Sequence, residues 1–135
     1  MGNKKSNPKQ TLVKNYIDLL YMTPSEISAK DIASLLQNNK ELKVQLWEGM
    51  NVLEIELSNE NSVDFEPLDI SFKEPTDISF VRNRNIKTIF VVSICDSDIS
   101  SMTPYFEQLV SQFNGFVCAD SADFYPVYVG SSKKY

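Results

Sequence analysis

The sequence predicts a single α+β domain with a central mixed β-sheet, two N-terminal helices and a C-terminal βαβ unit. The chain has 135 residues, of which 42% are hydrophobic, so one domain can bury a core without a disulfide or a metal. Apolar residues recur with helical spacing near the N-terminus and alternate with acids in the middle of the chain. A near-continuous apolar run then precedes a helical pattern and a further short apolar run.

The N-terminal part of the chain is expected to hold a basic arm and two helices. Residues 1–10 are polar and basic, which is typical of a flexible arm, and the domain is expected to span residues 11–135. Apolar residues from Leu12 to Leu20 recur at i, i+3, i+4 and i+7, which predicts a helix over residues 9–22. Ser28 is a good N-cap residue and predicts the start of the second helix.

The middle of the chain is predicted to form a β-hairpin followed by loops. Residues 42–47 fit either a strand or a helix. In residues 52–57 apolar residues alternate with polar ones, which predicts a strand with one face in water, and residues 63–65 can return as its hairpin partner. Two similar units follow, residues 66–72 and 74–80. Each contains a proline, which favours a loop or a strand edge.

The C-terminal part is predicted to be a βαβ unit. Residues 87–94 form an apolar, β-branched run, which predicts a central strand buried on both faces. A helical pattern that ends at Asn114-Gly115 precedes a short strand over residues 116–119. This order favours two parallel strands joined by the helix, and residues 125–129 are expected to add an edge strand.

The charge of the chain favours a basic protein partner. The net charge is −5 and the sequence pI is about 4.7, so nucleic-acid backbones and anionic membrane surfaces are expected to repel the protein. Nine acids lie between Val44 and Phe80, where Lys73 alone opposes them. Such a surface either keeps the protein soluble or steers a basic partner toward it.

The residue types needed for common enzymatic chemistry are missing, which predicts a protein that is not an enzyme and uses no cofactor. The chain has no histidine, and its four glycines form no phosphate-binding cluster. Cys95 and Cys118 are predicted to be core thiols, and they are candidate neighbours in the parallel strand pair. An alternative is a carboxylate-based Mg²⁺-dependent enzyme with Asp96, Asp98 and Asp120 around the ion.

The location of the protein is expected to be cytoplasmic. The N-terminal residues carry no signal-peptide pattern, and no apolar run approaches the roughly 18 residues of a membrane span. Met1-Gly2 and the lysines after it match the N-myristoylation pattern, so a lipid-anchored adaptor is a further alternative.

Two C-terminal segments carry a resemblance to a known class of proteins. Residues 80–90, Phe-Val-Arg-Asn-Arg-Asn-Ile-Lys-Thr-Ile-Phe, resemble the basic turn into a central strand in small bacterial immunity proteins. Residues 115–126 combine a glycine, a short strand and an acidic Asp-Ser-Ala-Asp-Phe loop before a proline. This segment is similar to single-domain immunity proteins of contact-dependent growth inhibition and related polymorphic toxin systems.

The resemblance implies a toxin inhibitor, or antitoxin, that binds its cognate toxin domain and blocks the active site. Many such toxins are basic nucleases, and an acidic inhibitor surface gives a complementary potential and fast association. The resemblance and the acidic composition together suggest these candidate contacts: Asp64, Glu66, Asp69, Asp77, Asp96, Asp98, Asp120, Asp123 and the aromatic Tyr125.

Overall fold

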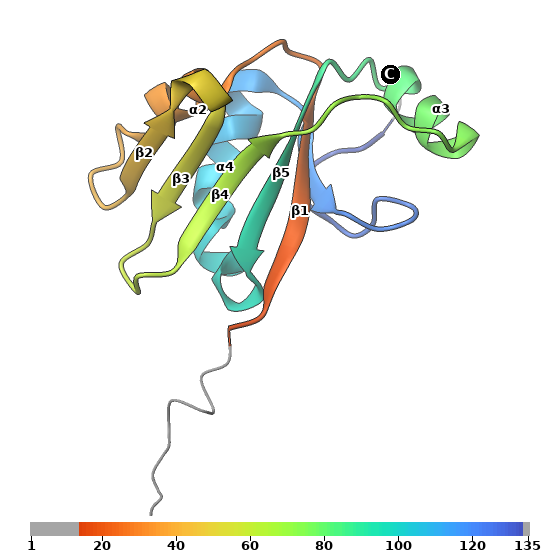
Figure 1. Ribbon diagram of the computed structural model, residues 1–135. Helices are drawn as coiled ribbons and strands as arrows, with labels where there is room; N and C mark the ends of the chain where they lie inside the picture. The colour runs from red at the N-terminus through yellow and green to blue at the C-terminus, as the bar shows by residue number, and fades with distance from the viewer. Residues whose placement is uncertain (1–13, 134–135) are drawn as a thin grey trace, which may run out of the picture.

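The protein is built around one seven-stranded β-sheet. The computed structural model describes residues 14–133, so the arm expected over residues 1–10 lies outside the described residues. The strand order is β2-β3-β4-β5-β1-β6-β7, and every neighbouring pair is antiparallel (Figure 1). The strands are β1 (Tyr16–Thr23), β2 (Lys43–Trp47), β3 (Val52–Glu56), β4 (Ser62–Pro67), β5 (Thr88–Cys95), β6 (Phe116–Ala119) and β7 (Val127–Gly130).

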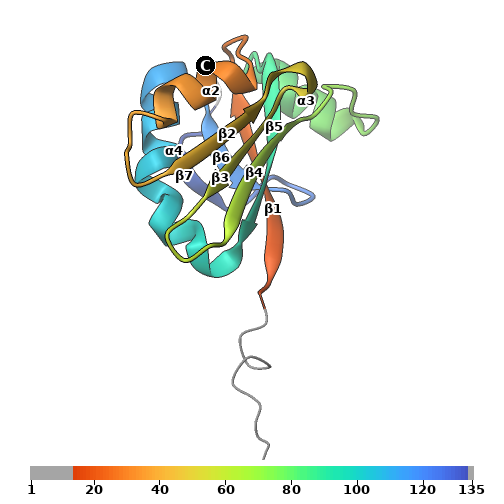
Figure 2. The ribbon, with the colours of Figure 1, turned by 60° about the vertical axis from the view of Figure 1, so that its left-hand side comes forward.

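Two helices, α2 (Ala29–Leu36) and α4 (Ile99–Phe113), pack on the same face of this sheet (Figure 2). The main core lies between them and the strands, and it includes Ile32, Phe65 and Phe106, which are all fully buried. Ser28 caps α2, because its side chain accepts a hydrogen bond from the Asp31 N–H while the Asp31 carboxylate accepts one from the Ser28 N–H.

The third helix, α3 (Pro75–Asn83), covers only part of the opposite face. A second core forms there between α3, the β4–α3 and β6–β7 loops, and the strands β5, β1 and β6. The rings of Phe72 and Phe80 both contact Phe124, with centroid separations of 6.0 and 4.6 Å. None of the helices within residues 14–133 covers the remainder of this face, over β2, β3 and β4 (Figure 1).

The helix predicted over residues 9–22 is wrong where the structure describes it, so within residues 14–133 only α2 precedes β2 where the sequence predicts two helices. Residues 16–23 form β1, which lies between β5 and β6; residues 9–13 of the expected helix lie outside the described part. The segment Leu19–Met22 is buried on both faces of the sheet. A strand buried on both sides carries apolar residues at consecutive positions, and such a run also satisfies a helical spacing.

The prediction of a mixed sheet with a paired βαβ unit is also wrong. The strands β5 and β6 do run in the same direction, but β1 lies between them and pairs antiparallel with both. Because of this inserted strand, Cys95 and Cys118 are not on neighbouring strands.

Most of the other predicted elements are confirmed. These are the capped helix after Ser28, the hairpin of β3 and β4, the central strand β5, the helix α4, the short strand β6 and the edge strand β7. Residues 42–47, left open between strand and helix, include the strand β2.

The two similar units at residues 66–72 and 74–80 adopt different structures. Glu66-Pro67 ends β4, an interior strand, whereas Pro75 is the first residue of α3. Proline suits a first helical position because the N–H that it lacks would have no partner there. The expectation of a loop or strand edge for the second unit is therefore wrong.

Candidate functional site

The candidate site is the part of the sheet that faces away from α2 and α4 and that α3 does not cover. Strand side chains alternate between the two faces. Leu53, Ile55, Val63 and Phe65 point into the main core, so the residues between them point to the opposite side. We call this surface the open face, and its strand side chains include Asp18, Gln45, Trp47, Glu54, Glu56, Asp64, Glu66 and Ser93.

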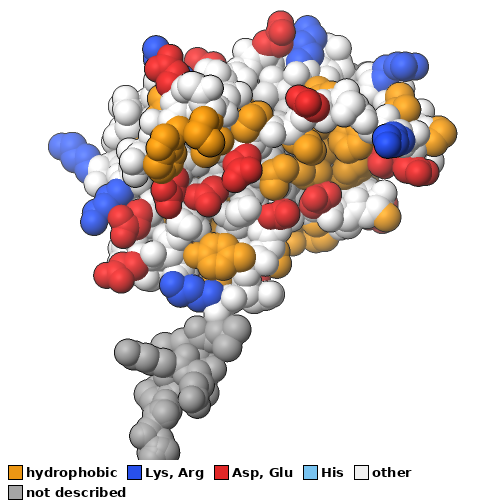
Figure 3. Space-filling view, viewed as in Figure 1, with side chains coloured by type: hydrophobic (Ala, Val, Ile, Leu, Met, Phe, Trp, Pro, Cys, Tyr) orange, Lys and Arg blue, Asp and Glu red, His pale blue; other side chains and the backbone are white. Residues whose placement is uncertain are grey.

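A single row of polar and acidic side chains crosses the open face. The strand register places Gln45 opposite Glu54, Glu54 opposite Asp64, Asp64 opposite Ser93, and Ser93 opposite Asp18. The Ser93 hydroxyl donates a hydrogen bond of 3.0 Å to Oδ1 of Asp18. Asp120, directly after β6, lies near enough to interact electrostatically with Asp18. Figure 3 shows the acidic side chains as a band across the sheet.

We call Glu54, Asp64, Asp18 and Asp120 the acidic row. Glu56 and Glu66 lie on the same face, on opposite sides of the acidic row. Glu56 is two residues from Glu54 along β3, and Glu66 is two residues from Asp64 along β4. Lys43 forms a salt bridge of 4.0 Å with Glu56, and both side chains are well exposed. Within residues 14–133 this is the one salt bridge made by these acids, so the open face is strongly negative.

Asp64 has the least favourable surroundings in the acidic row. Its Oδ1 atom is buried and has no hydrogen-bond partner among the described residues. Partial burial raises the pKa of the Asp64 carboxyl, and the nearby charges of Glu54 and Glu66 raise this pKa further. Burial, followed by the charge of Asp18, likewise raises the pKa of Asp120. A cation at this face would relieve the repulsion among these carboxylates.

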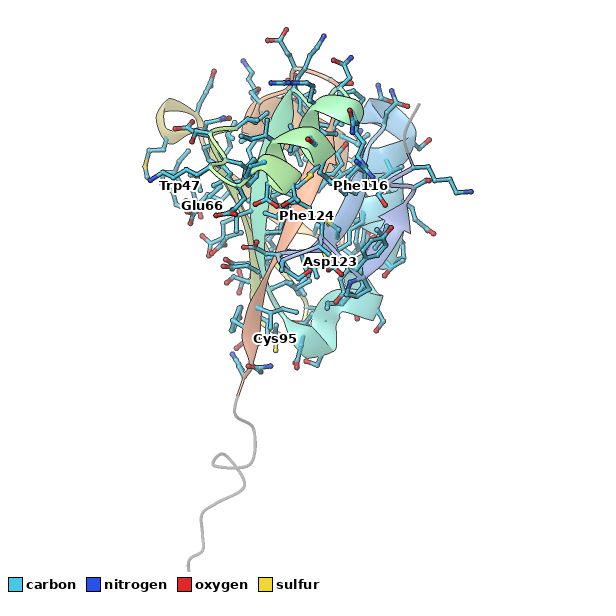
Figure 4. All side chains as sticks on the ribbon, turned by 90° about the vertical axis from the view of Figure 1, so that its right-hand side faces the viewer. Trp47, Glu66, Cys95, Phe116, Asp123 and Phe124 are labelled. Atoms are coloured by element: carbon cyan, nitrogen blue, oxygen red, sulfur yellow. The ribbon has the colours of Figure 1, made fainter. Side chains whose placement is uncertain are left out.

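Hydrophobic side chains border the acidic row. Trp47 is 39% exposed at the outer strand β2, and Tyr16 is 43% exposed at the start of β1. Figure 4, which shows the sheet nearly edge-on, places Trp47 and Glu66 on the same side. Val91 and Leu68 are partly buried where the open face meets the second core. Exposed aromatic residues beside charged ones are common at protein interfaces.

Of the sequence-predicted contacts, only Asp64, Glu66 and Asp120 belong to this surface. Asp69 lies exposed in the β4–α3 loop, and Asp77 is in the first turn of α3. Asp123 and Tyr125 belong to the β6–β7 loop, where the Ser121 hydroxyl donates to Oδ1 of Asp123. The structure therefore does not bring all nine predicted residues onto one surface.

Asp96 and Asp98 lie where β5 leads into α4 and have different surroundings. Asp96 is exposed and accepts a hydrogen bond of 3.0 Å from Nδ2 of Asn15. Asp98 is only 3% exposed, and its carboxylate accepts hydrogen bonds from Nδ2 of Asn59 and Nδ2 of Asn61, at 2.9 and 2.8 Å. Asp98 therefore holds the β3–β4 turn and is not available to a partner.

The geometry does not favour the Mg²⁺ site considered for Asp96, Asp98 and Asp120. Within residues 14–133, no three acidic or cysteine side chains are grouped closely enough to hold a metal ion. The two cysteines are free and buried. Burial raises the pKa of Cys118 to about 12, so this thiol stays protonated at neutral pH and is a poor nucleophile.

Sequence reasoning missed several residues of the open face, above all Asp18, Glu54 and Trp47. The sequence predicts a helix at Asp18, and it leaves residues 42–47 open between strand and helix. The signal for Glu54 was present, because the alternation over residues 52–57 places this acid on the water-facing side of a strand. The predicted hairpin extends this strand face to the strand that holds Asp64, but nothing in the sequence indicates that the face continues to Asp18.

No protein-family model, curated protein or solved structure matched the chain. Among residues 14–133, none of the helices has the length and apolar character needed to cross a membrane.

Proposed function

We propose that this protein is an immunity protein that binds a cognate bacterial toxin domain, a basic nuclease, and neutralises it without catalysing a reaction. In this proposal the open face covers the active site or the nucleic-acid groove of the toxin, in the cytoplasm that the toxin would attack. The C-terminal segments at residues 80–90 and 115–126 support the proposal through their resemblance to immunity proteins of contact-dependent growth inhibition.

One observation carries this proposal: acids from separate parts of the chain lie in one row, with Ser93 between Asp64 and Asp18, on a part of the sheet that no described helix covers. Repulsion between carboxylates on adjacent strands destabilises a sheet, so folding alone does not account for the arrangement. A basic partner surface would be attracted to these acids, which would offset their mutual repulsion and accelerate association of the two proteins. The bordering aromatic residues Trp47 and Tyr16 add apolar contact area.

The first test is the binding of the neighbouring gene product. We expect the gene immediately upstream to encode a large secreted protein with a variable C-terminal domain. That domain should bind this chain with a one-to-one ratio, and co-expression of the two should protect cells from its toxicity. An unrelated neighbour whose product neither binds nor is toxic would contradict the proposal.

The second test asks whether the open face makes the contact. The double variant Glu54→Gln/Asp64→Asn should weaken toxin binding by at least about thirtyfold if these residues are hot spots. The matched control is Glu107→Gln, which removes an exposed acid from α4 on the opposite side of the sheet. Calorimetric titration should show unchanged binding for this control. Equal affinities for the double variant and the control would rule out the open face.

A further inference from the structure

The chain carries a basic segment that leads directly into the open face. Residues 1–17 contain Lys4, Lys5, Lys9 and Lys14 and no acid. Lys14 is exposed, and Tyr16 begins β1 with its side chain on the open face. Asp18 of the acidic row comes two residues later.

Two hydrogen bonds hold the end of this segment beside β5, next to β1, which is an interior strand of the sheet. The Asp96 N–H donates a hydrogen bond of 2.9 Å to the carbonyl oxygen of Asn15, and Nδ2 of Asn15 donates one of 3.0 Å to Oδ2 of Asp96. Asn15 is thereby held at the end of β5, whose other neighbour is β4. The segment before Asn15 therefore starts beside the strands that carry the acidic row.

The segment is long enough to reach the acids on β4 and β3. Lys9 precedes Tyr16 by seven residues, and an extended chain of that length spans about 23 Å. The strand β3 is the third neighbour from β1, a distance of about 14 Å at ordinary strand spacing. Lys9 therefore has ample reach, and Lys4 and Lys5 have more.

The electrostatics of the open face match this segment. Asp64 has a buried carboxylate oxygen without a hydrogen-bond partner, and Lys43 is the one cation that forms a salt bridge with the face within residues 14–133. Individual exposed lysine–carboxylate contacts are weak. A tethered segment has an effective concentration in the millimolar range, so a few such contacts are enough to populate a bound state.

We propose that the N-terminal basic segment, residues 1–14, occupies the open face of its own chain when no partner is bound, with its lysines along the acidic row. The segment then acts as an internal competitor, which a basic partner must displace. This inference goes beyond the proposed function, because the contact is intramolecular and does not depend on any toxin.

The test uses the full chain with a nitroxide label attached at position 6 through Ser6→Cys. The native cysteines, Cys95 and Cys118, are buried, so the label is directed to the new site. In about 20 mM salt, amide NMR signals of Glu54, Asp64 and Ser93 should lose most of their intensity. They should recover in about 500 mM salt, because screening weakens exposed charge pairs.

Two charge-matched variants provide the control. Replacing Lys4, Lys5 and Lys9 by Gln in the labelled chain should abolish the loss of signal. Replacing Lys73, Lys87 and Lys133 by Gln removes the same charge from exposed positions elsewhere and should leave the loss unchanged.

Three results would overturn the inference. The first is a loss of signal confined to residues near Asn15 and Asp96 and unaffected by salt. The second is an equal response to both triple variants. The third is a loss of signal in a mixture of nitroxide-labelled chains and separate isotope-labelled chains, because a second copy would then occupy the face. Since the experiment contains no partner, none of these results bears on toxin binding.

Discussion

At the scale of single residues, Asp64 shows a conflict between stability and binding. It is opposite Glu54 on one neighbouring strand, it interacts with Glu66, and one of its oxygen atoms is buried without a hydrogen-bond partner among residues 14–133. Each of these features disfavours the charged form in the isolated protein. A position that is unfavourable for the fold but suited to a cation is typical of a binding surface.

Replacement of Asp64 by Asn should therefore stabilise the protein at neutral pH. The pKa of Asp64 is raised above 3.8 in the folded state, so the folded protein holds this proton more tightly than the unfolded chain does. The free energy of unfolding consequently falls as pH rises from about the ordinary aspartate pKa through the raised folded-state pKa. Because solvent screens this partly exposed carboxyl, Asp64→Asn should raise the free energy of unfolding at pH 7 by only about 0.5 kcal/mol, as measured by urea denaturation.

The gain should disappear at about pH 3, where Asp64 is protonated in both states. Glu107→Gln makes the same change of charge on α4 and should leave stability nearly unchanged at either pH. Destabilisation of more than about 1 kcal/mol by Asp64→Asn at pH 7 would mean that the carboxylate makes a stabilising contact within the fold.

At the scale of secondary-structure elements, the connection from α4 to β6 depends on one glycine. The helix ends at Phe113, and both Asn114 and Gly115 have positive φ angles, 67° and 88°. The chain passes so close to β1 that a Cβ atom on Gly115 would lie 2.0 Å from the carbonyl oxygen of Met22. A side chain at this position requires movement of β1, a central strand of the sheet.

Gly115→Ala should accordingly lower the free energy of unfolding by about 3 kcal/mol or more, because a strained φ and a backbone clash add together. Gly49→Ala is the matched control, since a Cβ atom built there would have no heavy atom within 4 Å apart from its own residue and the adjoining backbone. It should change stability by less than about 0.5 kcal/mol. Thermal and urea unfolding of the two variants would test this, and equal effects would contradict the close approach to β1.

Elements with local signals were predictable, and those that depend on tertiary context were not. The capping residues of α2 and the alternation in β3 are local, and the structure confirms both elements. The strand β1 was mistaken for a helix, because burial on both faces removes the alternation that marks a strand. The helix α3 was missed, because its Pro75 fits a loop as well as the first turn of a helix.

At the scale of the whole molecule, the strand order assembles the candidate site. Asp18, the hairpin acids Glu54 and Asp64, and Asp120 come from three distant parts of the sequence, and the pairings of β1, β3, β4, β5 and β6 bring them into one row. The sequence showed that the chain is rich in acids and that one strand has a water-facing acidic side. Apart from the hairpin of β3 and β4, it did not show which strands are neighbours, because the other pairings depend on contacts between distant residues.

The same strand order predicts how hydrogen exchange is distributed over the molecule. The strands β1 and β5 each have a partner on both sides, whereas β2 is an edge strand and pairs only with β3 among the described strands. Backbone amides inside a sheet exchange mainly through global unfolding, and amides at an edge exchange through local opening. Amides of Leu20 and Phe90 should therefore exchange at least about a hundredfold more slowly than the least protected amides of β2.

Native-state exchange followed by NMR measures these rates residue by residue. Comparison within the sheet is informative, because both groups of amides belong to the same protein under the same conditions. Equal and rapid exchange in β1 and β2 would contradict the position of β1 between β5 and β6. It would also remove the pairing of Asp18 with Ser93 on which the acidic row depends. Strong protection of β1 would support the register that places these acids side by side.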